Sequence, residues 1–567
     1  MSYISTTNGL RKPLENWSQI NWRKVNKVVK NLRQRIFLAR KLGNWRKLRN
    51  LQKLMQKSYA NLLLSVRRIT QTNKGKATAG IDKETINTPK QRVILVNNWN
   101  GGNTKPTKRV MIPKANGKKR PLGIPTVRDR IEQAVIMNSL EPEWEAVFES
   151  NSYGFRCGRS CQDAVEQCFI RTCVSNCGRD TWVLEADIKG FFDNIAHESI
   201  LKELSNFPQR NLIRGWLKAG FILKGKYHPT EMGTPQGGVI SPLLANIGLH
   251  GLEIFIKTTN PKLGMVRYAD DFIVTARDKG SLETIQIQIQ QWLSTKGLEL
   301  SAEKTQITSM EDGFDFLGFN HRHYNGKLLI KPSKKKVLDF CKRIGQEIKA
   351  LNGAEQEDII KKLNPILRGF ANYYRGVCSK ETFSYISSRL WQYLWRWAKR
   401  RHPNKNTKWV RKRYFKTVNG SQWTFATTTN NRRGKEKDLI LYPIAYTPIE
   451  RHVKVKGSAS PDDRSLKEYW EKRHQKYGKS YWERNSRNYK IAQNQNWKCP
   501  TCGEPLFNEE EIETHHIVSV AQGGLDSIEN LQHLHKSCHR QEHSKIQVKS
   551  LEVRLERSEL ETLMLRS

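Results

Sequence analysis

The sequence contains no long hydrophobic run. No stretch approaches the roughly 20 apolar residues that a helix needs to span a bilayer, although hydrophobic residues make up 37% of the chain. The N-terminal segment MSYISTTNGLRKPLENW also lacks the apolar core of a secretory signal peptide. We therefore expect no membrane partner and a cytoplasmic location, either in a bacterial cytosol or nucleoid or inside an organelle.

Acidic residues are scarce. The chain has 54 Asp and Glu against 98 Lys and Arg, a formal net charge of +44 at pH 7. Such a charge repels itself in a compact fold unless a polyanion neutralises it, and the phosphates of a nucleic acid are the leading candidate. Residues 16–81 contain 17 Lys or Arg and residues 382–435 contain 14, with no Asp or Glu in either segment. A surface that is merely soluble mixes both signs, so the pattern favours nucleic-acid binding.

Both acid-free segments show further patterning. In the first, apolar residues recur near helical spacing and predict two or three helices with a basic outer face: Val25, Val28, Val29, Leu32, Ile36, Leu38, Leu48, Leu51, Leu54 and Met55. In the second, aromatic residues alternate with cations. This suits the stacking of unpaired bases, although about half of these rings are expected to fill a helical core. After it, residues 457–489 are polar and charged, which suggests a linker or a small basic module.

Three carboxylates stand out in the middle of the chain. The segment TWVLEADIKGFFDNI (181–195) predicts a short strand that ends at Asp187, and MVRYADDFIVTAR (265–277) predicts a tight hairpin that carries Asp270 and Asp271. Carboxylate oxygens are the ligands that Mg²⁺ prefers, and two such ions about 4 Å apart can bind the attacking and leaving oxygens of an in-line displacement. Adjacent aspartates alone are more often a surface turn, so the surrounding motifs decide.

Those motifs occur in a specific order: MIPKANGKKRPLGIP (111–125), NSYGFR (151–156), GTPQGGVISPLLANI (233–247), YADD (268–271), GLELSAEKTQI (297–307) and GFDFLGF (313–319). Together they resemble the reverse transcriptases encoded by group II introns. The resemblance implies that Asp187, Asp270 and Asp271 are catalytic and hold Mg²⁺. It also implies contacts to the incoming nucleotide: Lys114 and Arg120 at the triphosphate, Phe191 under the sugar as a gate against a 2′-hydroxyl, and Gln236 with the two glycines after it at the template and nucleotide.

The segment after residue 331 extends the resemblance. LNPILRGFANYYRGV (363–377) and WRWAKRRHPNK (395–405) are similar to the thumb-like maturase region of the same family, which binds intron RNA and assists its splicing. A basic, aromatic-rich helical bundle beside a polymerase palm would also hold the template–primer duplex. The sequence does not separate RNA contacts from core and ordinary surface at Arg368, Tyr373, Tyr374, Arg400 and Arg401.

Near the C-terminus the sequence carries, in order, Cys499-x-x-Cys502, EIETHHI (511–517), GGLDSIENL (523–531) and LHKSCHRQEH (534–543). This order resembles an HNH nuclease of ββα-metal fold. The resemblance implies that His515, His539 and His543 hold a divalent metal and that His516 is the general base. Asn530 would orient His516 from the loop. His539 and His543 are spaced i, i+4, which puts both on one helical face.

The spacing of the cysteines also predicts a structural Zn²⁺ site. Its ligands would be Cys499, Cys502, His535 and Cys538, with His535 standing where the family usually has a fourth cysteine.

We therefore expect an α+β multidomain protein built as a right-hand polymerase. The expected parts are a basic helical N-terminal extension (1–100), fingers and palm (101–330), a thumb or maturase domain (331–425), a DNA-binding region or linker (426–495) and an HNH endonuclease domain (496–567).

The expected function joins Mg²⁺-dependent, RNA-directed DNA synthesis, assistance to splicing, and nicking of target DNA to prime reverse transcription during retrohoming. Its partners would be the intron RNA as a ribonucleoprotein, target DNA, an RNA template with a DNA primer, and dNTPs. Two alternatives remain at this stage: a maturase that only binds RNA for splicing, and a defence-associated reverse transcriptase.

Overall fold

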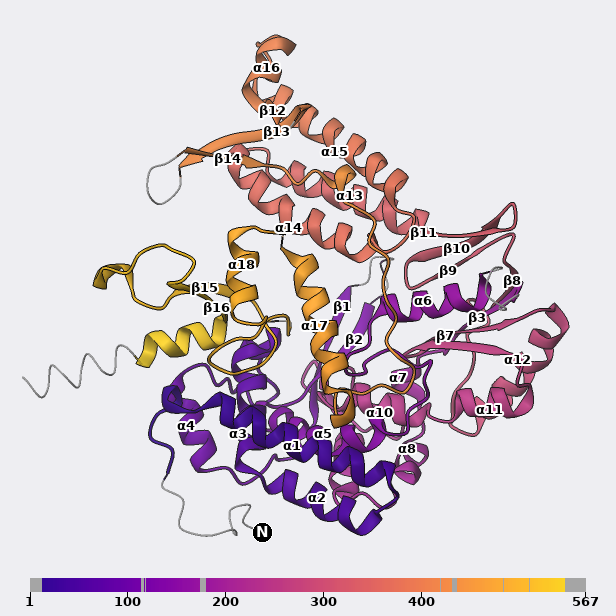
Figure 1. Cartoon of the computed structure of the whole chain (residues 1–567). Helices are drawn as coiled ribbons and strands as arrows, with labels where there is room; N and C mark the ends of the chain where they lie inside the picture. Colours follow the sequence, from indigo (N-terminus) through magenta and orange to yellow (C-terminus); the bar gives the residue numbers. More distant parts are fainter. Residues whose placement is uncertain are drawn as a thin grey trace, which may run out of the picture.

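The structure is a computed structural model of the chain. It describes residues 13–113, 117, 119–173, 180–418, 420–430, 436–482, 484–508 and 510–545. Lys114 lies outside the described residues. Figure 1 follows the chain from N-terminal helices through a central region of fingers and palm to a helical thumb, and then back to the N-terminal helices. No described helix is long and apolar enough to cross a membrane.

Polar side chains begin the N-terminal helices. Asn21, Asn44, Ser58 and Thr88 each accept a hydrogen bond from the backbone of the first turn that follows them, and so satisfy a donor that the helix leaves unpaired. The helices are α1 (Trp22–Lys41), α2 (Trp45–Lys57), α3 (Tyr59–Arg67) and α4 (Pro89–Asn97).

The predicted apolar stripe of these helices is buried at most positions, including Val25, Val29, Leu32, Ile36 and Leu48. Three of the predicted core residues are instead exposed: Val28, Leu38 and Leu54. These three side chains lie on the solvent-exposed sides of α1 and α2, so apolar spacing alone did not predict their burial correctly.

The basic face of α1 and α2 is only partly an outer face. The next long helix, α5 (Val127–Glu145), is almost entirely buried and presents glutamates to the N-terminal helices. Arg33 lies 2.8 Å from Glu141, and Arg49 lies 3.1 Å from Glu143. Several of the cations that the sequence suggested for nucleic acid therefore pair with α5 and hold the extension against the fingers.

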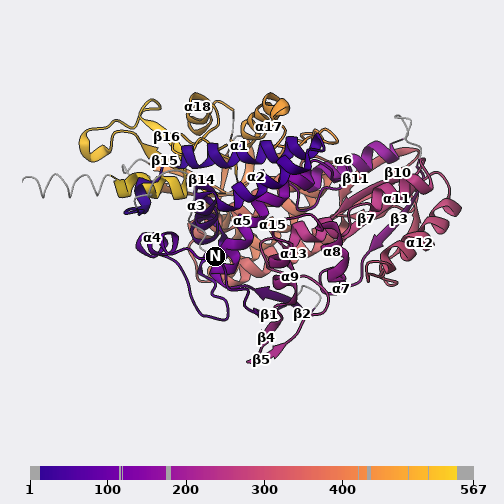
Figure 2. The same ribbon diagram turned by 90° about the horizontal axis from the view of Figure 1, so that it is seen from below.

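Two mainly antiparallel sheets form the fingers and palm. The fingers sheet has the strand order β2-β1-β4-β5 and the palm sheet the order β6-β7-β3-β8. Seen from below, the fingers strands project on the side of the molecule opposite α17 (Figure 2). The strands are β1 (Thr107–Pro113), β2 (Lys119–Ile124), β3 (Trp182–Asp187), β4 (Phe221–Leu223), β5 (Lys226–His228), β6 (Gly264–Tyr268), β7 (Asp271–Ala276) and β8 (Gln306–Ser309).

Helices cover the palm sheet and bury its apolar face. Phe272, Val274, Leu184 and the apolar side of α12 lie in one core with α10. Burial of this area is the main source of the rigidity with which the strand ends are held. The helices are α6 (Cys161–Thr172), α7 (Phe191–Asn194), α8 (His197–Glu203), α9 (Arg210–Lys218), α10 (Ser241–Gly248), α11 (Leu252–Thr259) and α12 (Lys279–Ser294).

A small sheet joins the palm to the thumb. Its strands β9 (Phe314–Phe316), β10 (Phe319–Tyr324) and β11 (Lys327–Pro332) are antiparallel neighbours. The thumb has its own core. It comprises α13 (Lys334–Ala350), α14 (Gln356–Tyr374), α15 (Lys380–Arg401), α16 (Thr407–Tyr414) and the strands β12 (Phe415–Val418), β13 (Ser421–Asn430) and β14 (Glu436–Ile440).

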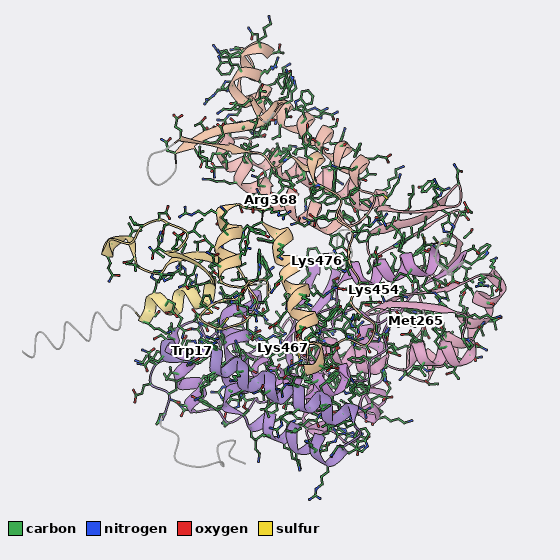
Figure 3. The ribbon with its side chains drawn as sticks, in the orientation of Figure 1. Trp17, Met265, Arg368, Lys454, Lys467 and Lys476 are labelled. Carbon is green, nitrogen blue, oxygen red and sulfur yellow. The ribbon has the colours of Figure 1, made fainter. Side chains whose placement is uncertain are left out.

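The segment predicted to be a linker is a packed strap, here residues 447–482. Its helix α17 (Lys467–Tyr481) places Trp470 in a core with the palm. Asp163 lies in the first turn of α6, where it forms a capping box with Ser160. It accepts hydrogen bonds from His452, the Val455 amide and Arg473. Several basic side chains come from this strap, among them Lys454, Lys467 and Lys476, which Figure 3 labels below Arg368 of the thumb.

The chain then returns to the N-terminal helices. Helix α18 (Arg487–Asn494) leads into a two-stranded antiparallel ribbon, β15 (Ile512–His516) and β16 (Leu531–His535), and residues 536–545 are helical. This ββα unit shares one hydrophobic core with α1, α3 and α5.

Candidate active sites and metal centre

The three aspartates meet at one end of the palm sheet. Asp187 ends β3 and lies directly opposite Asp271, the first residue of β7. Ala269 and Asp270 form the turn of the β6–β7 hairpin, because Tyr268 pairs with Asp271. Ala269 has a φ of 61°, a left-handed conformation that a residue other than glycine adopts at an energetic cost. The tight turn keeps Asp270 beside the other two carboxylates.

The electrostatics of this strand end show crowded negative charge. Burial and then the neighbouring Asp187 raise the pKa of Asp270. Burial and the neighbours Asp270 and Asp187 raise the pKa of Asp271 to about 7. Lys304 Nζ lies 2.6 Å from Asp187 Oδ2, and this hydrogen bond raises the pKa of Lys304. Lys304 therefore partly neutralises the carboxylate cluster, a role that its place in the GLELSAEKTQI motif did not reveal.

Within the described residues, two groups of side chains have potential metal-ligand atoms that all lie within 4.8 Å of one another inside the group. The three aspartates do not form such a group. A site for two ions does not require all of its carboxylates to meet at one point.

On the fingers side, Arg120 and Gln236 lie together. Arg120 Nε donates to Gln236 Oε1 at 2.7 Å, and the Gly123 amide of β2 donates to the Gln236 carbonyl at 2.6 Å. Gly237 has a φ of 119°, and a Cβ there would lie 2.5 Å from the Gly123 carbonyl oxygen. The close backbone approach that the motif predicted is thus to the fingers strand β2, which Gly237 allows and a larger residue would prevent.

The proposed sugar gate needs a correction. Phe191 is 2% exposed and lies in the palm core, so its ring is not available to a nucleotide. The next residue, Phe192, is only partly buried and packs edge-to-face against the exposed Phe155 of the NSYGFR motif. The sequence contained both rings, but residue spacing from Asp187 did not reveal which one faced the core.

Three of the five thumb residues considered for RNA binding have structural partners. Tyr373 donates its hydroxyl to the Leu317 carbonyl at 2.9 Å, and Tyr374 donates to that of Gly318 at 3.2 Å, so both anchor the thumb to the small sheet. Arg401 donates to the Ala354 carbonyl within the thumb. The remaining two, Arg368 and Arg400, are exposed.

In the C-terminal unit, three histidines converge. His515 lies on β15, whereas His539 and His543 lie one turn apart on the helix, and their ligand atoms all fall within 4.8 Å of one another. His543 Nε2 is 3.0 Å from His539 Nε2. Burial and then the two other histidines lower the pKa of His515, which favours the neutral imidazole that metals bind. Glu513 Oε2 accepts from His539 Nδ1 at 2.6 Å and fixes that ring, a partner that the sequence did not reveal.

The ring of His516 contacts an aspartate of the loop between β15 and β16, a partner that the sequence did not reveal. Its Nε2 lies 3.2 Å from Asp526 Oδ1, and Arg487 of α18 pairs with the same aspartate. Asn530 instead ties the loop: its side chain accepts from the Val518 amide at 2.8 Å and donates to the Leu525 carbonyl at 2.7 Å. Asn530 therefore positions His516 through the backbone, while Asp526 contacts the ring.

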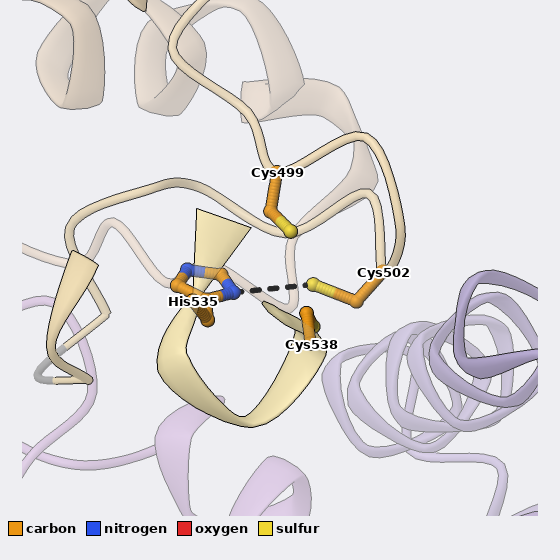
Figure 4. A group of neighbouring side chains, drawn as sticks. All are labelled: Cys499, Cys502, His535 and Cys538. Atoms are coloured by element: carbon orange, nitrogen blue, oxygen red, sulfur yellow. Dashed lines mark hydrogen bonds between the residues drawn. The ribbon is translucent and has the colours of Figure 1, made fainter. Parts of the chain in front are cut away.

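Four further ligand side chains surround one point, as Figure 4 shows: Cys499, Cys502, His535 and Cys538. All four are buried. Cys502 Sγ lies 3.3 Å from His535 Nδ1, while His535 Nε2 lies 3.0 Å from the Pro505 carbonyl oxygen. That outer hydrogen bond leaves Nδ1 facing the thiols. Three sulfurs and one imidazole nitrogen are a donor set that Zn²⁺ favours.

The fold and these sites define a right-hand nucleic-acid polymerase joined to a helical thumb and a ββα-metal nuclease unit. Comparison with known families agrees in each part. Residues 112–321 match the reverse transcriptase (RNA-dependent DNA polymerase) family and residues 17–99 the N-terminal domain of reverse transcriptase. Residues 337–415 match the group II intron maturase-specific domain, and residues 499–545 match HNH endonuclease.

Relatives point the same way. Protein YkfC of Escherichia coli (strain K12) is 33% identical over 367 residues, 56% of this chain and 94% of YkfC. Group II intron-encoded protein LtrA of Lactococcus lactis subsp. cremoris is 31% identical over 404 residues, 53% of this chain and 67% of LtrA. A telomerase structure from Candida albicans aligns with a TM-score of 0.33 and 14% identity, covering 54% of this chain and 66% of that chain, which is too weak to support a conclusion.

The chain belongs to the family of group II intron-encoded proteins. It combines a reverse transcriptase, a maturase domain and an HNH endonuclease domain in one multifunctional enzyme. The predicted family, fold class and enzyme classes are confirmed. The maturase and endonuclease domains favour an intron-encoded protein over a defence-associated enzyme, and the reverse transcriptase domain favours it over a maturase that only binds RNA.

Proposed function

We propose that Asp187, Asp270 and Asp271 hold the metal ions of RNA-directed DNA synthesis, and that the ions are Mg²⁺. The observation that carries this is the register that sets Asp187 opposite Asp271, with Asp270 in the adjoining turn. Crowded carboxylates with raised pKa values, an all-oxygen donor set, fit a hard divalent cation. When bound, such ions neutralise charge on the reacting phosphates and lower the pKa of the attacking hydroxyl.

The protein's own residues would then position the substrates. Arg120, held by Gln236, reaches the triphosphate as a forked donor, together with Lys114. Phe192, rather than Phe191, would lie under the sugar and exclude a 2′-hydroxyl. Because phosphoryl transfer needs little covalent help from a protein, positioning and charge account for most of the catalysis.

Asp270→Asn tests the polymerase assignment. We expect primer extension on poly(rA)/oligo(dT) to be lost, because one ion ligand is gone, while binding of the intron RNA in a filter or mobility-shift assay is unchanged. An exposed-residue control, Asp312→Asn, should extend normally. Extension by the Asp270→Asn protein at the wild-type rate would rule out the assignment.

For the C-terminal unit, we propose that His516 is the general base that activates water against a DNA phosphodiester. His515, His539 and His543 would hold the divalent ion that stabilises the leaving oxygen. The sequence-based expectation for this ion is Mg²⁺, but three imidazole nitrogens suit a softer ion such as Zn²⁺ better than Mg²⁺. Three imidazoles within 4.8 Å, one of them fixed by Glu513, support this set of ligands. The nicked strand would supply the 3′ end that primes reverse transcription during retrohoming.

The Cys499, Cys502, His535 and Cys538 cluster is proposed as a structural Zn²⁺ site. The proposed partners are the group II intron RNA, the target DNA, a template–primer and dNTPs. For the domain limits we retain 1–100, 101–330, 331–425, 426–495 and 496–567, and the basic side chains of the strap support a nucleic-acid role for the fourth region.

A further inference from the structure

One buried cation lies next to the Cys/His cluster without a carboxylate of its own. Arg67 ends α3 in the N-terminal extension and is 5% exposed. Its Nη2 donates to Cys538 Sγ at 3.0 Å and to Ser537 Oγ at 2.8 Å. Its guanidinium also stacks over the Trp22 ring of α1, 4.4 Å from the centroid. Within the described residues, no carboxylate oxygen is paired with this guanidinium; Glu510 is reached only through the Ser537 hydroxyl, 2.6 Å from Glu510 Oε2.

A buried guanidinium needs a negative partner, because removing an unpaired charge from water costs several kcal/mol. The proposed Zn²⁺ site supplies one. A divalent ion bound by three thiolates and one neutral imidazole carries a single net negative charge. The positive charge of Arg67, in contact with one of those sulfurs, balances it. The buried guanidinium and the negatively charged metal centre therefore neutralise each other.

The contacts around Arg67 join two parts of the chain that are far apart in sequence. Asn26 donates its side-chain amide to the Cys502 carbonyl at 3.2 Å. Gln541, on the C-terminal helix, donates to the Ser18 carbonyl at 2.7 Å and to that of Ile20 at 2.9 Å. The three buried cysteines belong to the same hydrophobic core as Trp22, Val66 and other residues of the N-terminal helices.

We propose that Arg67 is the counter-charge of the Cys/His metal centre, and that this centre thereby fixes the endonuclease domain to the N-terminal extension. The inference rests on the proposed Zn²⁺ site but goes beyond it: the metal stabilises an interface between domains as well as the fold of one. The nuclease site, whose four histidines lie on the same ββα unit, is then held in one orientation to the polymerase.

The test uses the full-length protein, purified from zinc-supplemented medium, and the variant Arg67→Met, which keeps most of the packing on Trp22 but removes the charge. The neighbouring Arg68→Met is the matched control, because Arg68 is exposed. Zinc content is measured by mass spectrometry, and zinc affinity by competition with a chromophoric chelator. Hydrogen–deuterium exchange is followed in residues 59–67 and 499–506.

Loss of an outer partner of a metal ligand typically lowers metal affinity about 10- to 100-fold. We expect that loss for Arg67→Met, together with faster exchange in both segments, and neither change for Arg68→Met. Arg67→Lys, which keeps the charge, should restore part of the affinity. The reciprocal variant Cys499→Ser should accelerate exchange in residues 59–67, although it lies on the opposite domain.

Primer extension by each variant confirms that the polymerase is folded. If Arg67→Met binds zinc as tightly as the wild type and residues 59–67 exchange unchanged, the role of Arg67 is wrong while the zinc site stands. If the wild-type protein holds no zinc at all, the zinc site itself is wrong and the inference fails with it.

Discussion

The carboxyl of Asp271, proposed above as a metal ligand, lies where its negative charge destabilises the metal-free fold, and this effect can be measured without substrate. Burial and the neighbouring carboxylates raise its pKa from 3.8 to about 7 in the folded protein. When folding raises the pKa of a carboxyl, the folded protein becomes less stable as pH rises from the pKa in the unfolded state, about 4, through the pKa in the folded state. Asp271→Asn removes the ionisable group, so without Mg²⁺ the variant should be more stable than the wild type above pH 7.

The magnitude follows from that shift. A rise from 3.8 to about 7 corresponds to at most about 4 kcal/mol when the group is ionised. Although neighbouring groups crowd its carboxyl, Asp271 as a whole residue remains exposed at the end of the hairpin, so solvent screening reduces the effect and we expect about 1–2 kcal/mol. For a domain the size of the reverse transcriptase match, this is an increase of about 2–8 °C in Tm.

Differential scanning fluorimetry at pH 8 and pH 4, with and without Mg²⁺, measures the difference in Tm between Asp271→Asn and the wild type. At pH 4 the difference should largely disappear, because the carboxyl is then mostly protonated in the folded state. Added Mg²⁺ should stabilise the wild type and not the variant, since only the wild type keeps the full ligand set. The exposed Asp312→Asn should show none of these effects. A variant no more stable than the wild type at pH 8 without metal would refute the reasoning.

Two further predictions concern the neighbouring rings and the endonuclease. Phe192→Ala should relax discrimination against ribonucleotides in primer extension while the protein stays folded. Phe191→Ala should instead cost about 3–5 kcal/mol of stability, because it opens a cavity in the palm core. Equal discrimination by Phe192→Ala and the wild type would exclude Phe192 as the gate. His516→Ala should eliminate nicking of target DNA and leave primer extension at the wild-type rate, and nicking that persists would exclude His516 as the base.

The sequence predicted most where a motif and a local element coincide. The strand that ends at Asp187 and the hairpin carrying Asp270 and Asp271 are both present, because alternation of apolar residues and a short turn are local signals. The Cys/His spacing likewise brought its four side chains together. The roles of these residues remain predictions that the experiments above test.

What the sequence could not supply was the set of partners from distant parts of the chain. The pairing of Arg33 with Glu141 and the hydrogen bond of Arg67 to Cys538 each join segments whose proximity depends on the tertiary fold. Composition alone assigned the cations of residues 16–81 to nucleic acid, whereas α5 neutralises some of them. The choice between Phe191 and Phe192 depended on which side of one short helix faces the core.

The strap of residues 447–482 has a mechanical consequence for the thumb. The chain crosses from the palm to the thumb after β11, and it crosses back through the strap. In the strap, the Glu450 amide donates to the Arg375 carbonyl at 3.0 Å, and His452 binds Asp163 at 2.9 Å. A body attached at two separate points cannot swing freely; it turns about the line that joins them. Any movement of the thumb relative to the palm is therefore restricted by both crossings.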